Sequence, residues 1–243
     1  MLDLRSKKVF LFDLDDTLIN AHQAKEGGLL RAYQKLVSEC ITGFEDLPSY
    51  DEFYSGLKQI YEIRDQNGRK KYFDFDPEVF EEYCNGLSGN SSLIFRHYGF
   101  SLAARLCWHY RDTKNSSLMA LPHTFEVLNF LRARGTVYCI TEGKCNYQHT
   151  KAMLTDIEMY VESVFVTNDK VNELKEFAKE RGFDRDNTVM IGDSENDTRA
   201  GKNAEISTVC IKSGVHDYES FKIMADITID DLDQLLKMLK AKD

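Results

Sequence analysis

The protein has 243 residues, of which 42% are hydrophobic and 29% are charged, so the chain can bury a sizeable core in one large domain or two smaller ones. With only 3 prolines and 14 glycines, it is neither collagen-like nor a low-complexity disordered chain. Its formal net charge of −9 argues against nucleic acid or an anionic membrane surface as the main partner.

The chain carries no run of roughly 18 apolar residues, the length that a membrane helix needs. Only a short apolar run precedes Asp13, less than a signal peptide requires, so we expect neither kind of segment. The 6 cysteines form no C-x-x-C pair and have no zinc-ligand spacing with histidine. We therefore expect reduced thiols and a cytoplasmic protein.

Short apolar runs that each end in a polar residue are the clearest architectural signal. They span 8–12, 136–140, 161–166, 188–191 and 206–211. Continuous runs of this length are typical of strands buried on both faces of a parallel sheet. Helical patterns fall at 125–134, 146–154, 171–181, 195–203 and 231–239. This alternation of strand and helix predicts an α/β fold, a doubly wound, Rossmann-like parallel sheet.

The stretch 20–119 differs from the rest of the chain, because it contains helical patterns and no convincing strand. The helices are expected at 25–39, 50–64, 77–85 and 102–110. A segment of this size is too long for a loop and should have its own core, to which its many aromatic residues would contribute. A minority of these aromatics could line a substrate pocket. We predict an α/β core domain, 1–19 with 120–243, and an inserted α-helical domain, 20–119.

Polar residues gather where the predicted strands end. In an open parallel sheet, ligands bind outside the carboxyl ends of the strands, so these residues should meet at one edge. The candidates are Asp13, Asp15, Thr141, Glu142, Gly143, Lys170, Asp193 and Asp197. Carboxylates, a hydroxyl and an ammonium at one edge indicate a site for a hard cation together with an anion.

Residue types suggest the chemistry. Mg²⁺ prefers oxygen ligands, which Asp13 and Asp193 can supply. A carboxylate can also attack phosphorus, and a second one, Asp15, could protonate the leaving oxygen and then activate water. Thr141, with the backbone N–H groups after it, could hold phosphoryl oxygens, while Lys170 neutralises charge in the transition state.

For two of these residues, a purely structural role also has to be considered. The segment from Ser194 to Asp197 matches a capping box, so Asp197 could be only a helix cap. Lys170 stands at a predicted helix N-terminus, where a cation opposes the helix dipole. An anionic group near Lys170 would remove that penalty.

These motifs resemble those of the haloacid dehalogenase superfamily. FDLDDTL at 12–18 looks like its first motif and GDSEND at 192–197 like its fourth. Thr141 and Lys170 are similar to the second-motif threonine and the third-motif lysine. The insert lies where this superfamily has an α-helical cap.

The resemblance implies a Mg²⁺-dependent phosphatase that acts through a phosphoaspartate. Asp13 would be nucleophile and metal ligand, and Asp15 would be acid–base catalyst and bind the metal through its backbone carbonyl. Asp193 would bind the metal directly, and Asp197 would support it through water. Substrate contacts are expected from Thr141, Glu142, Gly143 and Lys170.

The sequence departs from the usual pattern at three positions, one of which is Val171, where the family usually has Pro after the third-motif lysine. Glu142 replaces the usual Asn after the second-motif threonine, so its charge should either point away from the phosphate or weaken phosphate binding. His123 replaces a usual Gly and is interpreted as structural. Gln148 and Lys151, which also occur in some relatives, are interpreted as structural too.

Several functions remain open at this stage. A phosphoryl transferase such as a sugar phosphomutase would use the same aspartate. A metal-independent 2-haloacid dehalogenase is disfavoured, because displacing halide from carbon leaves no alkoxide for Asp15 to protonate. A non-catalytic binding protein would keep crowded carboxylates at a cost. We predict a small phosphorylated metabolite as substrate, with no nucleic acid or membrane partner, and the oligomeric state is open.

Overall fold

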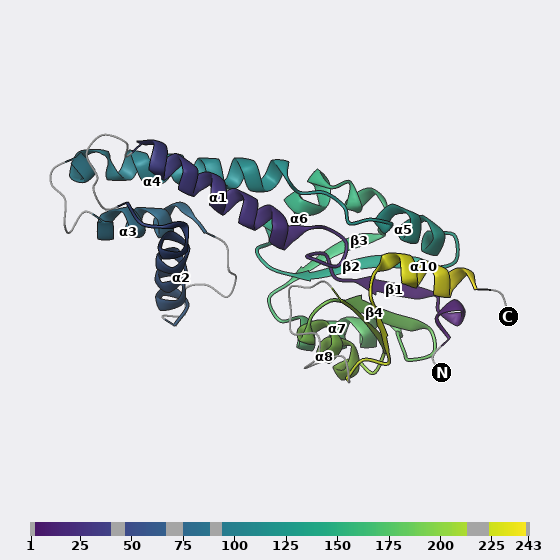
Figure 1. Ribbon diagram of the computed structural model, residues 1–243. Helices are drawn as coiled ribbons and strands as arrows, with labels where there is room; N and C mark the ends of the chain where they lie inside the picture. Colours follow the sequence, from purple (N-terminus) through teal and green to yellow (C-terminus); the bar gives the residue numbers. More distant parts are fainter. Residues whose placement is uncertain (1–2, 40–46, 67–74, 88–93, 213–223, 242–243) are drawn as a thin grey trace. The chain divides into compact units, whose positions relative to one another are not determined.

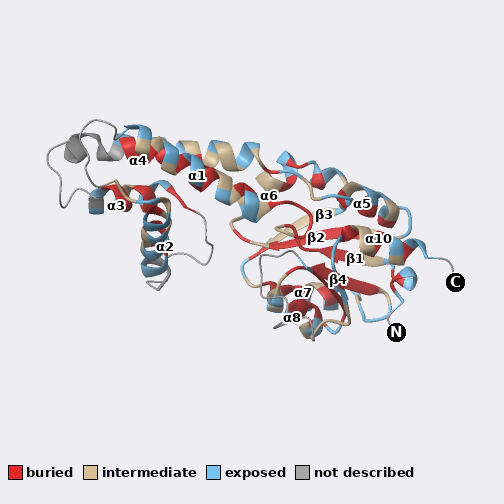
Figure 2. Ribbon diagram, in the orientation of Figure 1, coloured by how far each residue is buried: buried red, intermediate tan, exposed pale blue. Residues whose placement is uncertain are grey.

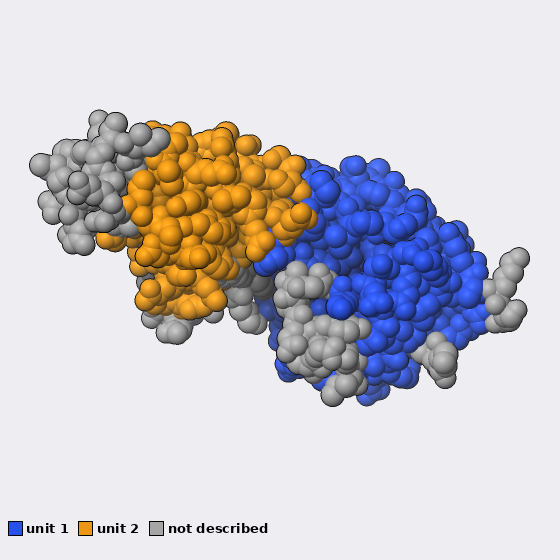
Figure 3. All heavy atoms as spheres, viewed as in Figure 1, with its two compact units in different colours: residues 1–22, 118–243 blue, residues 23–117 orange. Residues whose placement is uncertain are grey.

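The computed structural model describes residues 3–39, 47–66, 75–87, 94–212 and 224–241. The chain forms two compact units, which Figure 3 shows in different colours. Unit 1 consists of Met1–His22 and Leu118–Asp243, and unit 2 consists of Gln23–Ser117.

Unit 1 is built on a six-stranded sheet in the order β3-β2-β1-β4-β5-β6, with every neighbouring pair parallel. The strands are β1 (Val9–Phe12), β2 (Thr136–Glu142), β3 (Ser163–Thr167), β4 (Thr188–Gly192), β5 (Ser207–Ile211) and β6 (Ile227–Ile229). The chain builds outward from β1 to β3, then returns to β4 on the other side of β1 and builds outward again. This is the predicted doubly wound arrangement, and its reversal point is the carboxyl end of β1.

Helices cover both faces of this sheet (Figure 1). They are α5 (Thr124–Arg132), α6 (Cys145–Leu154), α7 (Lys170–Arg181), α8 (Glu195–Asn203) and α10 (Leu232–Lys240), with short 3₁₀ turns η1 (Leu4–Ser6) and η2 (Ile157–Met159). On one face α5 contacts α10, and on the other α7 packs against α8. The sheet is therefore the middle layer of three.

The strands β1, β2, β4 and β5 are buried, which explains their continuous apolar sequences, whereas the edge strands β3 and β6 are only partly buried (Figure 2). Leu11 of β1 belongs to one core cluster with Ile140, Met190 and Leu174 of α7. Its neighbour Phe10 is equally buried and points to the opposite face, because side chains alternate along a strand. Each such side chain contributes about 1.5–3 kcal/mol on burial, so the core anchors the strand ends firmly.

Two details of unit 1 differ from the sequence-based expectation. Strand β6 was not expected, since a run of three residues is too short to give a periodic signal. Strand β2 continues through Thr141 and Glu142, which pair with β3 instead of following the strand.

The N-cap of α5 explains one departure from the family pattern. His123 has a φ of 64°, a left-handed conformation that glycine adopts with less strain. Its ring lies 2.6 Å from the Glu126 carboxylate, measured from Nδ1 to Oε2. This conformation agrees with the structural interpretation of His123.

Unit 2 contains α1 (Ala21–Glu39, which starts in unit 1), α2 (Tyr50–Gln66), α3 (Pro77–Leu87) and α4 (Ile94–Ser116). Its core is aromatic, with Phe53, Phe80 and Tyr110 fully buried. At Gly28 of α1, an added Cβ would lie 2.6 Å from the Tyr110 carbonyl oxygen, so only glycine allows α1 and α4 to approach this closely. Each predicted helix lies within an observed one, and α4 is much longer than predicted.

Among the helices that the structure describes, none combines the length and the apolar character needed to cross a membrane.

Candidate active site

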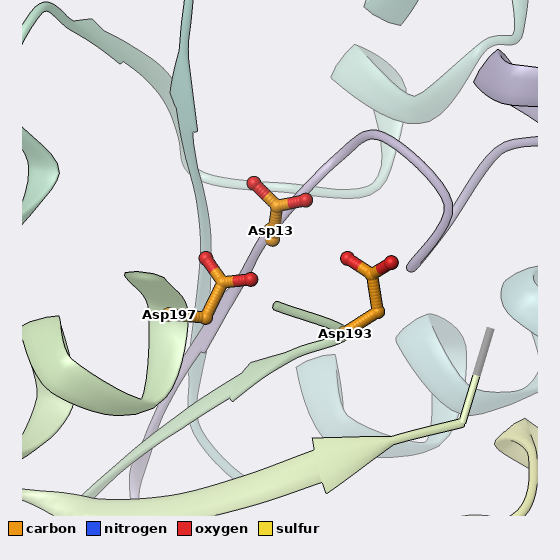
Figure 4. Close-up of side chains that lie close together, drawn as sticks. All are labelled: Asp13, Asp193 and Asp197. Carbon is orange, nitrogen blue, oxygen red and sulfur yellow. The ribbon is translucent and has the colours of Figure 1, made fainter. Parts of the chain in front are cut away.

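Three carboxylates converge at the reversal point of the sheet. Asp13 directly follows β1, and its backbone N–H donates to the Ile191 carbonyl at 2.9 Å, which fixes it against β4. Asp193 follows β4, and Asp197 lies in the first turn of α8. Each side chain offers an oxygen within 4.8 Å of those of the other two, and all three are buried. Figure 4 shows the three carboxylates close together, turned to the same side of the view.

Lys170 supplies a counter-charge to this cluster. It is the first residue of α7, and its ammonium Nζ lies 2.5 Å from Asp13 Oδ1 and 2.6 Å from Asp197 Oδ1. The anions expected beside a cation at a helix N-terminus are therefore present. Burial lowers the pKa of Lys170, but the Asp13 and Asp197 carboxylates outweigh it and hold that pKa above its usual value, so the ammonium stays charged.

Asp197 is both a helix cap and a member of the cluster. Its Oδ2 accepts hydrogen bonds from the Ser194 backbone N–H at 3.1 Å and from the Ser194 hydroxyl at 2.6 Å, completing a capping box. Its other oxygen faces Lys170. At Gly192 a Cβ would lie 2.4 Å from the Asp197 carboxyl carbon, so glycine is needed where β4 ends. The structural and functional interpretations of Asp197 are thus compatible.

Asp193 is held by a residue of the first motif. The hydroxyl of Thr17, which is fully buried, donates to Asp193 Oδ1 at 3.3 Å. Asp16, in the same loop, accepts the His22 backbone N–H at 2.9 Å in the first turn of α1, which gives this aspartate a structural role.

The buried acidic cluster is electrostatically strained on its own. Burial raises the pKa of Asp13 well above its usual range, the Lys170 ammonium lowers it, and the Asp197 and Asp193 carboxylates raise it again. Three carboxylates and one ammonium leave a formal charge of −2. A divalent cation would neutralise this charge, and clustered carboxylate oxygens are the donors that Mg²⁺ prefers. The residues present therefore fit a Mg²⁺ ion.

The end of β2 is tied to both helices on one face of the sheet. The Glu142 carboxylate accepts the Lys170 backbone N–H at 2.9 Å through Oε1 and the Asn196 side-chain amide at 2.6 Å through Oε2. The Gly143 N–H donates to the Thr167 carbonyl at 3.1 Å, and Thr141 is buried within the strand. The charge of Glu142 is thus directed at the N-terminal turns of α7 and α8.

Asp15 lies in a different environment from the buried cluster. Its Oδ2 accepts from Lys151 Nζ at 2.5 Å and from Gln148 Nε2 at 3.2 Å. Its Oδ1 is buried and has no hydrogen-bond partner among the described residues. Lys151 and Gln148 are more than structural residues of α6, because both contact a candidate catalytic group. Their spacing of three on a helix that follows a motif strand could have indicated a shared face toward the site.

Comparison with known proteins places the chain in a family. The model of the haloacid dehalogenase-like hydrolases matches residues 7–205. Over 241 residues the chain is 23% identical to the glyceraldehyde 3-phosphate phosphatase of Methanocaldococcus jannaschii, covering 96% of this chain and 97% of that protein. The enzyme of the same name from Pyrococcus furiosus is 25% identical over 249 residues, covering 98% and 95%.

A solved structure shows the same fold. The HAD-hydrolase YfnB from Bacillus subtilis, solved bound to magnesium, matches with a TM-score of 0.64 and 19% identity, covering 97% of this chain and 99% of that one. The family match spans most of the chain and includes all four strand-end motifs. The chain therefore belongs to the haloacid dehalogenase-like hydrolase family.

Proposed function

We propose that this protein is a Mg²⁺-dependent phosphatase that hydrolyses a small phosphomonoester through an aspartyl phosphate on Asp13. The proposal depends on one observation. The buried carboxylates of Asp13, Asp193 and Asp197 lie together, and the Lys170 ammonium pairs with the first and the last of them. Anionic and cationic groups together at a sheet edge suit a substrate that is itself an anion and is bound with a metal.

The carboxylates of Asp13 and Asp193 would hold Mg²⁺, with the Asp15 backbone carbonyl as a further ligand and Asp197 in support. When bound, the ion supplies positive charge that offsets repulsion between a carboxylate nucleophile and a phosphate. Lys170, paired with Asp13 and Asp197, adds charge of the same sign.

In the first half of the reaction, an Asp13 carboxylate oxygen forms a bond to phosphorus as the ester P–O bond breaks. Asp15 gives its proton to the departing ester oxygen, which leaves as an alcohol. Lys170 and the Thr141 hydroxyl stabilise the charge on the phosphoryl oxygens.

In the second half, the Asp15 carboxylate takes a proton from a water molecule as the water oxygen attacks phosphorus. The bond between phosphorus and the Asp13 oxygen breaks, which releases inorganic phosphate and restores the Asp13 carboxylate. Asp15 thereby regains the proton that it lost in the first half, so the cycle closes.

A small sugar phosphate is the first substrate to consider. The two relatives named above match over nearly their full length, and both are called glyceraldehyde 3-phosphate phosphatase. At 23% and 25% identity they support the class of substrate better than the individual compound. We further propose that the helices of 20–119 act as a cap that selects the substrate.

Other reactions use the same nucleophile but fit less well. Halide displacement needs no proton donor for a leaving alkoxide, so it leaves Asp15 and its two partners without a role. A phosphomutase differs in the acceptor, a sugar hydroxyl in place of water.

The proposal is tested with a panel of phosphorylated metabolites, including glyceraldehyde 3-phosphate and hexose phosphates, assayed for phosphate release with Mg²⁺. We expect at least one compound to be turned over catalytically. A protein that releases no phosphate but interconverts two sugar phosphates would be a mutase. Mass spectrometry after acid quenching should detect one phosphoryl group on Asp13, and its consistent absence would contradict the covalent route.

A further inference from the structure

Asp15 is held by two side chains of α6 that come from far along the chain. Lys151 Nζ and Gln148 Nε2 both donate to the same oxygen, Oδ2, while Oδ1 is buried and has no hydrogen-bond partner among the described residues. The two oxygens of this carboxylate are therefore not equivalent. One is committed to protein contacts, and the other is available for a proton.

Gln148 links this carboxylate to the central sheet. Its Nε2 also donates to the Glu142 carbonyl oxygen at 2.5 Å, so one amide group bridges the end of β2 and the loop after β1. The two acceptors fix the orientation of the amide, because its own oxygen would be repelled by both. That oxygen, Oε1, is left buried without a partner among the described residues, an arrangement that costs free energy.

The backbone is shaped to allow this contact. At Gly143 an added Cβ would lie 2.6 Å from Gln148 Nε2 and 2.7 Å from its Cγ. Any larger residue at 143 would displace the side chain that bridges Glu142 and Asp15. The glycine that follows Glu142 thus makes room for a polar contact with a candidate catalytic group.

Lys151 supplies the charge in this arrangement. Its side chain is about one-fifth exposed, so the contact with Asp15 is neither fully buried nor open to solvent. An ammonium at this distance restrains the carboxylate more strongly than a neutral donor does. Together with Gln148 it restricts rotation of the Asp15 side chain about its terminal bond.

We propose that Lys151 and Gln148 are positioning residues that hold Asp15 Oδ2 and thereby present Oδ1 for proton transfer. The inference rests on the proposed function, since it assumes that Asp15 exchanges protons with the leaving group and with water. Neither side chain needs to touch the substrate, so both act through Asp15. Proton transfer is sensitive to the placement of the donor, and loss of restraint should slow it.

The test compares two substrates of the Mg²⁺-loaded protein. One is 4-nitrophenyl phosphate, whose leaving group needs little protonation, and the other is the alkyl phosphate turned over fastest in the panel. We expect Lys151→Met to lower kcat/KM about 10–100-fold for the alkyl phosphate and less than about 3-fold for the aryl phosphate. Gln148→Met should likewise lower kcat/KM more for the alkyl phosphate than for the aryl phosphate. Lys151→Arg should retain most of the activity.

A double-mutant cycle then separates positioning from a general structural effect. In the Asp15→Asn background, Lys151→Met should cause no further loss with the alkyl phosphate, since the group it positions is already disabled. Lys175→Met serves as the matched control, because Lys175 is exposed on α7. Thermal unfolding of each variant checks that the fold is retained.

The outcomes are distinct for the inference and for the function on which it rests. If Lys151→Met affects both substrates equally, or costs as much with Asn at position 15 as with Asp, the positioning role is wrong. An unchanged rate for Lys151→Met would refute it as well. If Asp15→Asn itself leaves alkyl phosphate hydrolysis unchanged, the proposed acid–base role fails instead.

Discussion

The carboxyl edge of the sheet in unit 1 and the helical core of unit 2 bury different kinds of side chain. At the sheet edge, Asp13, Asp193, Asp197 and Lys170 are withdrawn from water. In unit 2, Phe53, Phe75, Phe80 and Tyr110 fill the core, and Asp76 is the one buried charged residue among those that the structure describes there. Burying apolar rings stabilises a fold, whereas burying clustered charges costs free energy, which Lys170 offsets only in part and a bound cation would offset further.

Substitutions in the two regions should therefore have opposite effects on activity and on stability. Changes to the clustered carboxylates of the sheet edge should abolish activity with little loss of stability. Changes in the aromatic core of unit 2 should lower stability directly.

Asp13→Asn should reduce phosphate release by at least about 10³-fold, because it removes the nucleophile and a metal ligand together. The midpoint of thermal unfolding without metal should fall little or rise, since one of three crowded carboxylates is neutralised. The control is Asp156→Asn, an exposed aspartate with a φ of 58° that asparagine also tolerates. Near-normal turnover by Asp13→Asn would exclude Asp13 as nucleophile.

Removing divalent ions with EDTA should suppress turnover by at least about 10²-fold, and Mg²⁺ should restore it. Added Mg²⁺ should also stabilise the fold. At a Mg²⁺ concentration 100 times its dissociation constant, the free energy of unfolding should rise by about 2.7 kcal/mol. Asp193→Asn should weaken this stabilisation, which calorimetry can measure. Full activity in EDTA would instead favour metal-free chemistry of the dehalogenase kind.

Phe80→Ala should lower the free energy of unfolding by about 3–5 kcal/mol, because the ring is fully buried against Phe53, Phe75 and Tyr110. Urea titration followed by circular dichroism measures the loss. Trp108→Ala is the matched aromatic control, since Trp108 is 60% exposed and its removal should cost much less. Equal losses for the two variants would show that the aromatic cluster does not stabilise unit 2.

Glu142→Ala should lower stability by about 1–2 kcal/mol and phosphatase activity about 10-fold, because the Lys170 backbone N–H and the Asn196 amide lose their acceptor. Glu142→Gln should be nearly neutral for stability, since a rotated Asn196 amide can still pair with it. Glu176→Ala, an exposed change on α7, is the control. A fully active Glu142→Ala would show that this contact does not help to place Lys170.

Asp226→Asn should lower stability at neutral pH by about 1–2 kcal/mol. Burial alone would raise the pKa of Asp226, but hydrogen bonds from Arg185, Lys202 and the Thr208 backbone outweigh it and hold the pKa well below its usual value. A depressed pKa stabilises the fold above about pH 4, and this stabilisation is lost as the pH falls through the folded-state pKa. Urea titrations at pH 7 and pH 3 should show the difference between the two proteins shrinking in acid.

Most of the fold of unit 1 is determined by the sequence alone. Buried parallel strands need continuous apolar runs, and each run here ends in polar residues, so the strands and their functional ends can be located from local composition. The same reasoning gave Asp13, Lys170, Asp193 and Asp197 as neighbours, because parallel strands present their carboxyl ends at one edge. Strand β6 escaped this reasoning, since three residues on the edge of a sheet carry too little pattern.

The pairing of side chains that are far apart in the chain depends on how the elements pack in three dimensions. Lys151 and Asp15 are 136 positions apart, and nothing in the local pattern of α6 says which residue of the first motif its side chains reach. Likewise, the charge of Glu142 acquired a structural explanation only when the N-termini of α7 and α8 were found beside it. Periodicity reports which face of an element is buried, whereas the partner of a polar group depends on packing between elements.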